Sequence, residues 1–110
     1  MDRNIVVFPA VETFDTGCTY RQQAEKIVIE AAEVFAEAQK FTGDDMEEDR
    51  RQRIIDAMLS ECADVIQATT NLLRMAGVDN AGQIMYDCYR RNRARGRYGR
   101  KTSSDTESWR

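Results

Sequence analysis

The chain has 110 residues, of which 42% are hydrophobic and 32% charged, a single proline and a net charge of −3. This length supports one modest core, and no apolar run is long enough to span a bilayer, so we expect no membrane partner. The absence of histidine argues against zinc sites and against ferritin-like di-iron bundles. Three cysteines without a C-x-x-C motif indicate reduced thiols in a cytoplasmic protein.

Helix-favouring residues dominate the sequence and predict an all-α fold, a small bundle of three main helices completed by homo-oligomerisation. Residues 1–18 should be irregular, because Pro9 and Gly17 interrupt the helical pattern. Residues 1–98 should form a single domain, with residues 99–110 as a disordered polar tail. In chain order, the helices should span about 19–41, with Thr19 as a cap, about 46–76, ending at Gly77, and from Asp79 or Asn80 to about Arg95, ending at Gly96.

Two pairs of carboxylates lie three residues apart within the first two predicted helices. Glu30 and Glu33 form the first pair, and Glu61 and Asp64 form the second. This spacing places both members of a pair on one helix face, beside an apolar stripe. Antiparallel packing of the helices would bring all four groups together, where protons or cations must relieve their repulsion. Because all four ligands are oxygens, the site would favour Mg²⁺ or Mn²⁺. The alternative interpretation is that the two pairs are solvated carboxylates on the surface and form no site.

The chain contains the motif E-x-x-E, followed after 27 residues by the motif E-x-x-D. This pattern resembles that of the MazG-like all-α nucleoside triphosphate pyrophosphohydrolases. KIVIEAAEVFAEAQK resembles the first family helix, with Lys26 one turn before Glu30, and ECADVIQATTNLL resembles the second. YRRNRARGRYG resembles the downstream basic segment, so the resemblance covers roughly residues 21–98. The chain departs from the pattern at Ile29, where many members carry another glutamate, and this weakens any role for an extra ligand.

The resemblance implies a four-helix-bundle arrangement in a homodimer or homotetramer, and hydrolysis of an NTP or dNTP to the monophosphate and pyrophosphate. It implies that Glu30, Glu33, Glu61 and Asp64 are catalytic and hold Mg²⁺ or Mn²⁺. One of these four residues, or Glu37, would be the general base. The predicted substrate-binding residues are Lys26, Asn71, Arg91, Asn92 and Arg95.

Charge is divided unequally along the chain. Residues 1–89 contain 8 basic and 17 acidic side chains, whereas residues 90–110 contain 8 basic and 2 acidic ones. The basic arm could hold phosphate oxygens that a metal does not reach. Two other functions stay open: a non-catalytic helical interaction module, and a nucleic-acid-binding protein that uses this arm, although nucleic acid is not the partner we expect.

Apolar residues occupy more than one face of the predicted helices. Ile29 and Leu59 lie away from the main apolar stripes of the first two helices, which indicates self-association. In the third helix, Ile84 and Met85 belong to the predicted inner face, which Asn92 continues. An asparagine on an inner face needs hydrogen-bond partners, supplied by a neighbouring backbone or by a nucleotide.

Overall fold

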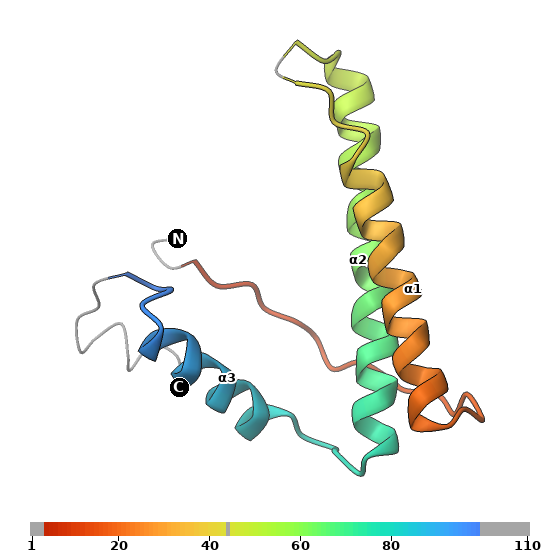
Figure 1. Ribbon diagram of the computed structural model, residues 1–110, viewed down its shortest axis with the longest axis vertical. Helices are drawn as coiled ribbons and strands as arrows, with labels where there is room; N and C mark the ends of the chain where they lie inside the picture. The colour runs from red at the N-terminus through yellow and green to blue at the C-terminus, as the bar shows by residue number, and fades with distance from the viewer. Residues whose placement is uncertain (1–3, 44, 100–110) are drawn as a thin grey trace. The chain divides into compact units, whose positions relative to one another are not determined.

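Helices make up all the regular structure of the computed structural model, which describes residues 4–43 and 45–99 (Figure 1). These helices are α1 (Tyr20–Ala38), α2 (Glu48–Met75) and α3 (Gly82–Ala94). No strand occurs among the described residues, so the all-α prediction is confirmed. Within the same residues, no helix combines the length and the apolar character needed to cross a membrane.

The chain divides into two compact units, the first ending at Val78 and the second beginning at Asp79. The first unit contains α1 and α2, and the second contains α3. The single domain expected for residues 1–98 stays a prediction. A disordered tail is predicted for residues 99–110, and residues 100–110 of it lie outside the described residues.

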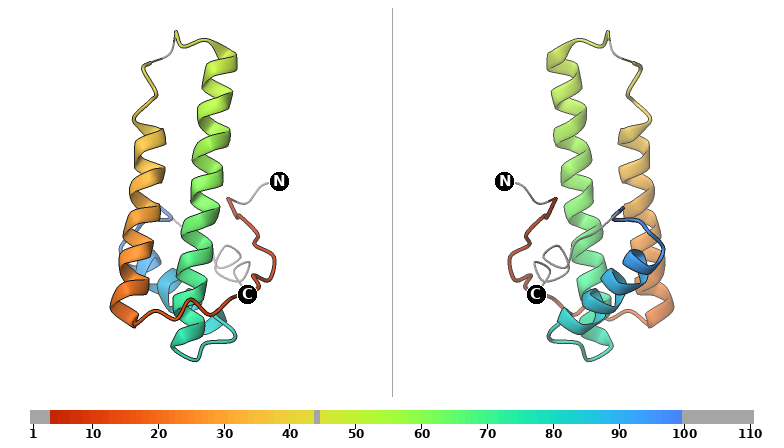
Figure 2. Two further views of the ribbon diagram at one scale, coloured as in Figure 1. Left: turned by 90° about the vertical axis from the view of Figure 1, so that its right-hand side faces the viewer. Right: turned by 90° about the vertical axis from the view of Figure 1, so that its left-hand side faces the viewer.

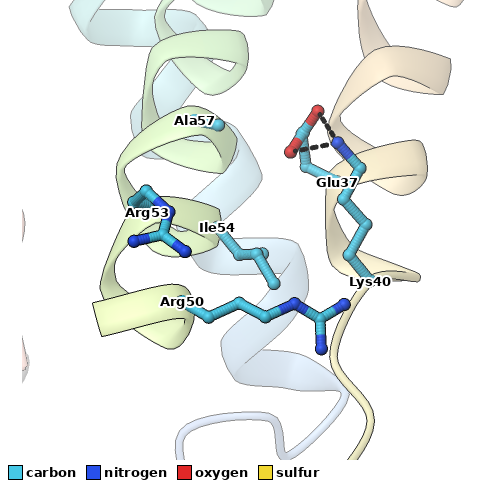
Figure 3. Close-up of a pocket in the computed structure, with 6 residues that line it drawn as sticks. All are labelled: Glu37, Lys40, Arg50, Arg53, Ile54 and Ala57. Carbon is cyan, nitrogen blue, oxygen red and sulfur yellow. Dashed lines mark hydrogen bonds and ion pairs between the residues drawn. The ribbon is translucent and has the colours of Figure 1, made fainter. Parts of the chain in front are cut away.

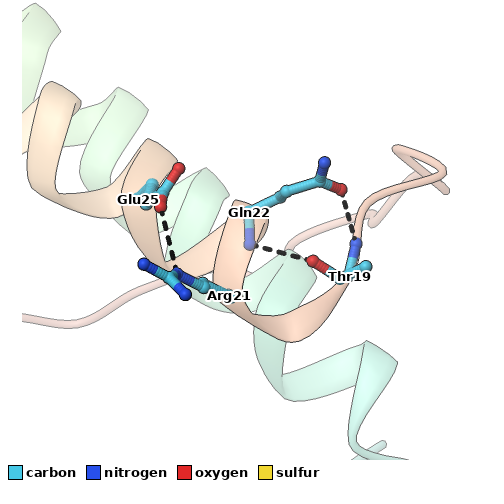
Figure 4. A network of polar contacts seen from close by, with 4 residues as sticks. All are labelled: Thr19, Arg21, Gln22 and Glu25. Carbon is cyan, nitrogen blue, oxygen red and sulfur yellow. Dashed lines mark hydrogen bonds and ion pairs between the residues drawn. The ribbon is translucent and has the colours of Figure 1, made fainter.

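A capping box begins α1. The hydroxyl of Thr19 accepts a hydrogen bond from the backbone N–H of Gln22 at 3.1 Å, and Gln22 Oε1 accepts one from the backbone N–H of Thr19 at 2.9 Å (Figure 4). The cap satisfies N–H groups that the first turn of a helix leaves unpaired. Nearby, Arg21 and Glu25 form an exposed ion pair at 3.5 Å, which adds little stability. The predicted cap at Thr19 is confirmed.

Glycines end α2 and α3 at the predicted positions. Gly77 has a φ of 85° and Gly96 a φ of 74°, in the left-handed region where glycine carries no Cβ penalty. After Gly77, the backbone N–H of Val78 donates to the carbonyl of Leu73 at 3.0 Å. This bond satisfies a carbonyl of the last turn and turns the chain away from the axis of α2.

α1 and α2 run antiparallel and pack against each other (Figure 2). The buried residues at this packing include polar side chains in addition to the apolar Ile54 and Ala68. Gln23 is only 1% exposed; its Nε2 donates to the carbonyl of Ala68 at 3.0 Å, and its Oε1 accepts from the hydroxyl of Thr16 at 2.9 Å. Because a buried amide needs partners, these bonds favour one register between the two helices.

The irregular segment before α1 is anchored to α2. Asn71 Oδ1 accepts hydrogen bonds from the backbone N–H of Phe14 at 3.2 Å and from Gln67 Nε2 at 3.1 Å. Gln67 Nε2 also donates to the carbonyl of Glu12 at 3.1 Å. Residues 4–19 contain no helix or strand, as predicted for the described part of this segment.

Aromatic side chains form the packing cluster of the α3 unit. Tyr89 is the buried residue of α3, and its ring centroid lies 5.1 Å from that of Tyr98 and 6.3 Å from that of Tyr86. Ile84 and Met85 are 44% and 50% exposed, so the predicted inner face is not covered among the described residues, and its burial against a second copy stays a prediction. Tyrosine rings carry a large apolar area, and the contacts with Tyr86 and Tyr98 contribute to the burial of Tyr89.

Candidate metal centre and the adjoining basic cleft

Four carboxylate side chains converge between α1 and α2. One oxygen from each lies within 4.8 Å of the others. The three-residue spacing within each pair and the antiparallel packing of the helices together produce this convergence, as the spacing predicts. The members of this carboxylate cluster are Glu30 and Glu33 on α1, and Glu61 and Asp64 on α2.

One oxygen atom of the cluster lacks the partner that its burial requires. Glu30 and Glu61 are half-buried, whereas Glu33 and Asp64 are exposed. Glu61 Oε2 is buried and has no hydrogen-bond partner among the described residues. Buried carboxylate oxygens are nearly always hydrogen-bonded or bound to a cation. The donor set, made of oxygens alone, fits a hard cation such as Mg²⁺ or Mn²⁺.

Proximity shifts the protonation of two members of the cluster. A hydrogen bond with Glu33, then desolvation and the charges of Glu33, Asp64 and Glu30, raise the pKa of Glu61 to about 7. Desolvation, followed by the charges of Glu33 and Asp64 and a hydrogen bond with Glu33, raises the pKa of Glu30. Like charges at short range favour the neutral acid. Near neutral pH, the metal-free cluster therefore retains a proton that a cation would replace.

A cleft of about 360 Å³ opens between the end of α1 and the start of α2 (Figure 3). Both carboxylate oxygens of Glu37 accept hydrogen bonds from Lys40 Nζ, at 3.0 and 2.9 Å. Arg50 and Arg53 reach the same cleft from α2, and neither forms an ion pair or hydrogen bond with a described residue. The lining residues of this basic cleft are Glu37, Lys40, Arg50, Arg53, Ile54 and Ala57.

The basic cleft begins one helical turn from the carboxylate cluster. Glu37 follows Glu33 by four residues on α1, and Ala57 precedes Glu61 by four residues on α2. The small side chain of Ala57 leaves the space beside the cluster open. The arginines of this cleft are not among the residues predicted from the sequence, although the run RRQR at residues 50–53 is a signal for them.

Two predicted substrate-binding residues belong to the same unit as the cluster. Lys26 is exposed and lies one turn before Glu30 on α1, on the side of the cluster away from the basic cleft. Asn71 is 3% exposed, and its Oδ1 accepts the hydrogen bonds that anchor the segment before α1. Asn71 therefore has a packing role, and the substrate contact expected of it stays a prediction.

The other three predicted substrate-binding residues belong to the α3 unit. Arg91 and Arg95 are exposed. Asn92 Oδ1 accepts a hydrogen bond from Arg97 Nη1 at 3.0 Å, and its Nδ2 donates to Cys88 Sγ at 3.6 Å. Local contacts thus satisfy the amide of Asn92 without a ligand. Binding of substrate by these residues stays a prediction.

Comparison with protein-family models, with curated proteins and with solved structures finds no match for this chain. The resemblance of its motifs to the MazG-like enzymes is therefore a hypothesis.

Proposed function

We propose that this protein is a metal-dependent nucleoside triphosphate pyrophosphohydrolase, which converts an NTP or dNTP to the monophosphate and pyrophosphate. The observation that supports it most is the carboxylate cluster, in which a buried oxygen of Glu61 has no partner. A hard cation would satisfy that oxygen and neutralise the repelling acids. The choice of reaction comes from the MazG-like order of the two carboxylate pairs and the basic segment that follows them.

The four acids of the cluster would hold Mg²⁺ or Mn²⁺ through their oxygens. When bound, the metal would neutralise charge on the phosphate oxygens and lower the pKa of the attacking water. The general base is one of the four cluster residues or Glu37. Both oxygens of Glu37 are engaged by Lys40 Nζ, which favours a member of the cluster. Lys26, Arg91 and Arg95 would steady the phosphates.

Exposed apolar side chains support the proposal of a homodimer or homotetramer with a four-helix-bundle arrangement. Val28 is 68% and Phe35 64% exposed on α1, and Leu59 is 57% exposed on α2. Val28 and Phe35 are seven residues apart, so they lie on one face that a second copy would cover. The cysteines are free thiols, which agrees with the cytoplasmic location that we propose.

The direct test is to incubate the protein with a panel of NTPs and dNTPs and to measure pyrophosphate release. We expect release from at least one triphosphate, and we expect EDTA to abolish it. In a parallel thermal melt, Mg²⁺ and a nonhydrolysable triphosphate together should raise Tm more than either alone. Release from no triphosphate in the panel, with no joint stabilisation, would refute the proposed function. Salt-sensitive DNA binding without a metal effect would favour the nucleic-acid alternative.

A further inference from the structure

The basic cleft and the carboxylate cluster carry opposite charges one helical turn apart. Three cationic side chains and one carboxylate line the cleft, which leaves a balance of two positive charges. The neighbouring cluster gathers four acids. This arrangement is complementary to a ligand that combines a metal cation with a polyanion, because the cation would occupy the cluster and the anion would extend into the cleft.

Arg50 and Arg53 are the groups in the cleft that are available to such a ligand. Neither has an ion pair or hydrogen-bond partner among the described residues, whereas Lys40 is already paired. Arg51, which lies between them in sequence, instead stacks its guanidinium 5.5 Å from the ring centroid of Phe41. A guanidinium group binds phosphate oxygens through two parallel hydrogen bonds, so two unpaired ones favour a phosphate-containing ligand.

The size and lining of the cleft favour phosphate groups over a nucleobase. Its volume of about 360 Å³ is near the lower limit for ligand pockets, which hold about 300–1,000 Å³. Among the described residues, no aromatic side chain lines it, so it offers no ring on which a base could stack. The acidic residues 47–49 at the start of α2 are not part of its lining.

We propose that the basic cleft is the subsite for the diphosphate end of the ligand, with Arg50 and Arg53 binding phosphate oxygens beyond the reach of the metal. The nature of the remaining ligand rests on the proposed function, but the subsite itself would also bind free pyrophosphate. Lys26 lies on α1, whereas Lys40 lies two residues beyond the end of that helix. The helix from Lys26 to its last residue, Ala38, alone spans about 18 Å, so a single phosphate chain does not reach both lysines. The nucleoside monophosphate end, whose phosphate Lys26 would bind, is therefore directed toward Lys26.

The test is calorimetric titration of the full-length protein with inorganic pyrophosphate in the presence of Mg²⁺. The double variant Arg50→Gln/Arg53→Gln should bind about 100-fold more weakly, since each charge-assisted contact contributes about tenfold or more. The control Arg21→Gln/Arg74→Gln removes the same charge from exposed positions outside the cleft and should stay within about twofold of the wild type. If the double variant loses helicity by circular dichroism, Arg53→Gln alone replaces it.

Three results would overturn this inference: unchanged pyrophosphate binding in the cleft variant, an equal loss in the control, or an equal loss of binding to a nucleoside monophosphate. The monophosphate should bind the cleft variant as it binds the wild type, because its phosphate would remain at the cluster. Triphosphate hydrolysis by the wild type is measured separately. If the protein hydrolyses no triphosphate but binds pyrophosphate through these arginines, the subsite is upheld and the proposed function fails.

Discussion

One carboxylate oxygen of Glu61 on α2 lies within 4.8 Å of one of Glu33 on α1, and a proton shared between the two groups in a hydrogen bond is the largest of the causes that raise the pKa of Glu61 to about 7. Two carboxyl groups share such a bond only while one of them keeps its proton. A cation bound to the same oxygens would displace that proton. Metal binding and proton release are therefore coupled at this pair.

This coupling makes the stability of the metal-free protein depend on pH. The folded pKa of Glu61 is raised from 4.5 to about 7, so the folded state binds the proton more tightly than the unfolded chain does. The stabilising contribution is complete below pH 4.5 and is lost as the pH rises through about 7. We expect Tm in EDTA to fall more steeply over this window in the wild type than in Glu61→Gln.

Differential scanning calorimetry at a series of pH values measures this difference. Saturating Mg²⁺ should reverse the loss in the wild type, because the cation replaces the proton between the carboxylates. Identical slopes for the wild type and Glu61→Gln in EDTA would contradict the hydrogen bond between Glu33 and Glu61.

Glu61→Gln should abolish hydrolysis and yet stabilise the metal-free protein. The amide has nearly the same shape but removes a charge from a repelling cluster, so Tm near pH 8 should rise. Turnover should fall by about 100-fold or more, since even residues that only orient metal ligands contribute about 10–100-fold. Glu25→Gln, at an exposed position on α1, is the matched control. Wild-type turnover in Glu61→Gln would eliminate the cluster as the metal centre.

The choice of metal should follow the preference of a compact oxygen site. Mg²⁺ and Mn²⁺ should both support pyrophosphate release, whereas Ca²⁺ should support it poorly at the same concentration. Ca²⁺ takes longer bonds and a looser geometry, which would misplace the attacking water relative to the phosphorus. Initial rates with each metal provide the measurement, and equal rates with Ca²⁺ would mean that the cation only screens charge.

Asn71→Ala should act chiefly on stability, because the contacts of Asn71 within the described residues are packing contacts. The substitution removes the acceptor of the Phe14 N–H and should lower the free energy of unfolding by about 1–3 kcal/mol. Gln52→Ala, which breaks only an exposed contact with Asp56, should change it by less than about 0.5 kcal/mol. The free energy of unfolding, measured by urea denaturation, reports the packing role of Asn71, and KM reports a contact with the substrate. A raised KM with unchanged stability would show that Asn71 contacts the substrate instead.

The convergence of the cluster could be predicted because it depends on local spacing alone. Residues three apart share a helix face, and the pairs lie on helices that pack antiparallel. The basic cleft could not be predicted in this way, since Arg50 and Arg53 approach Lys40 only in one register of α1 against α2. The buried bond between Gln23 and Ala68 favours that register. Gln23 precedes the half-buried Ile27 by four residues, so both side chains lie on one face of α1. This position is a sequence signal for burial that is easily missed in a polar residue.

The exposure of the predicted inner face of α3 has a different physical reason. Apolar periodicity identifies Ile84 and Met85 as one face of the helix, but it does not determine which neighbours will cover that face. Contacts with Tyr86 and Tyr98 instead surround Tyr89. Tyr98 lies beyond the end of the helix, so its contribution cannot be inferred from helical periodicity.

Substitution of Arg95 should separate a specific phosphate contact from general charge attraction. Arg95→Ala should lower kcat/KM by about tenfold or more, since a charge-assisted phosphate contact contributes about 1.5–3 kcal/mol. Arg90→Ala removes the same charge from an exposed position on α3 and should have little effect. Deletion of residues 101–110, outside the described residues, is a second control for net charge. If either control lowers turnover as much as Arg95→Ala does, the basic segment acts through bulk electrostatics, and the contacts predicted for Arg91, Asn92 and Arg95 are wrong.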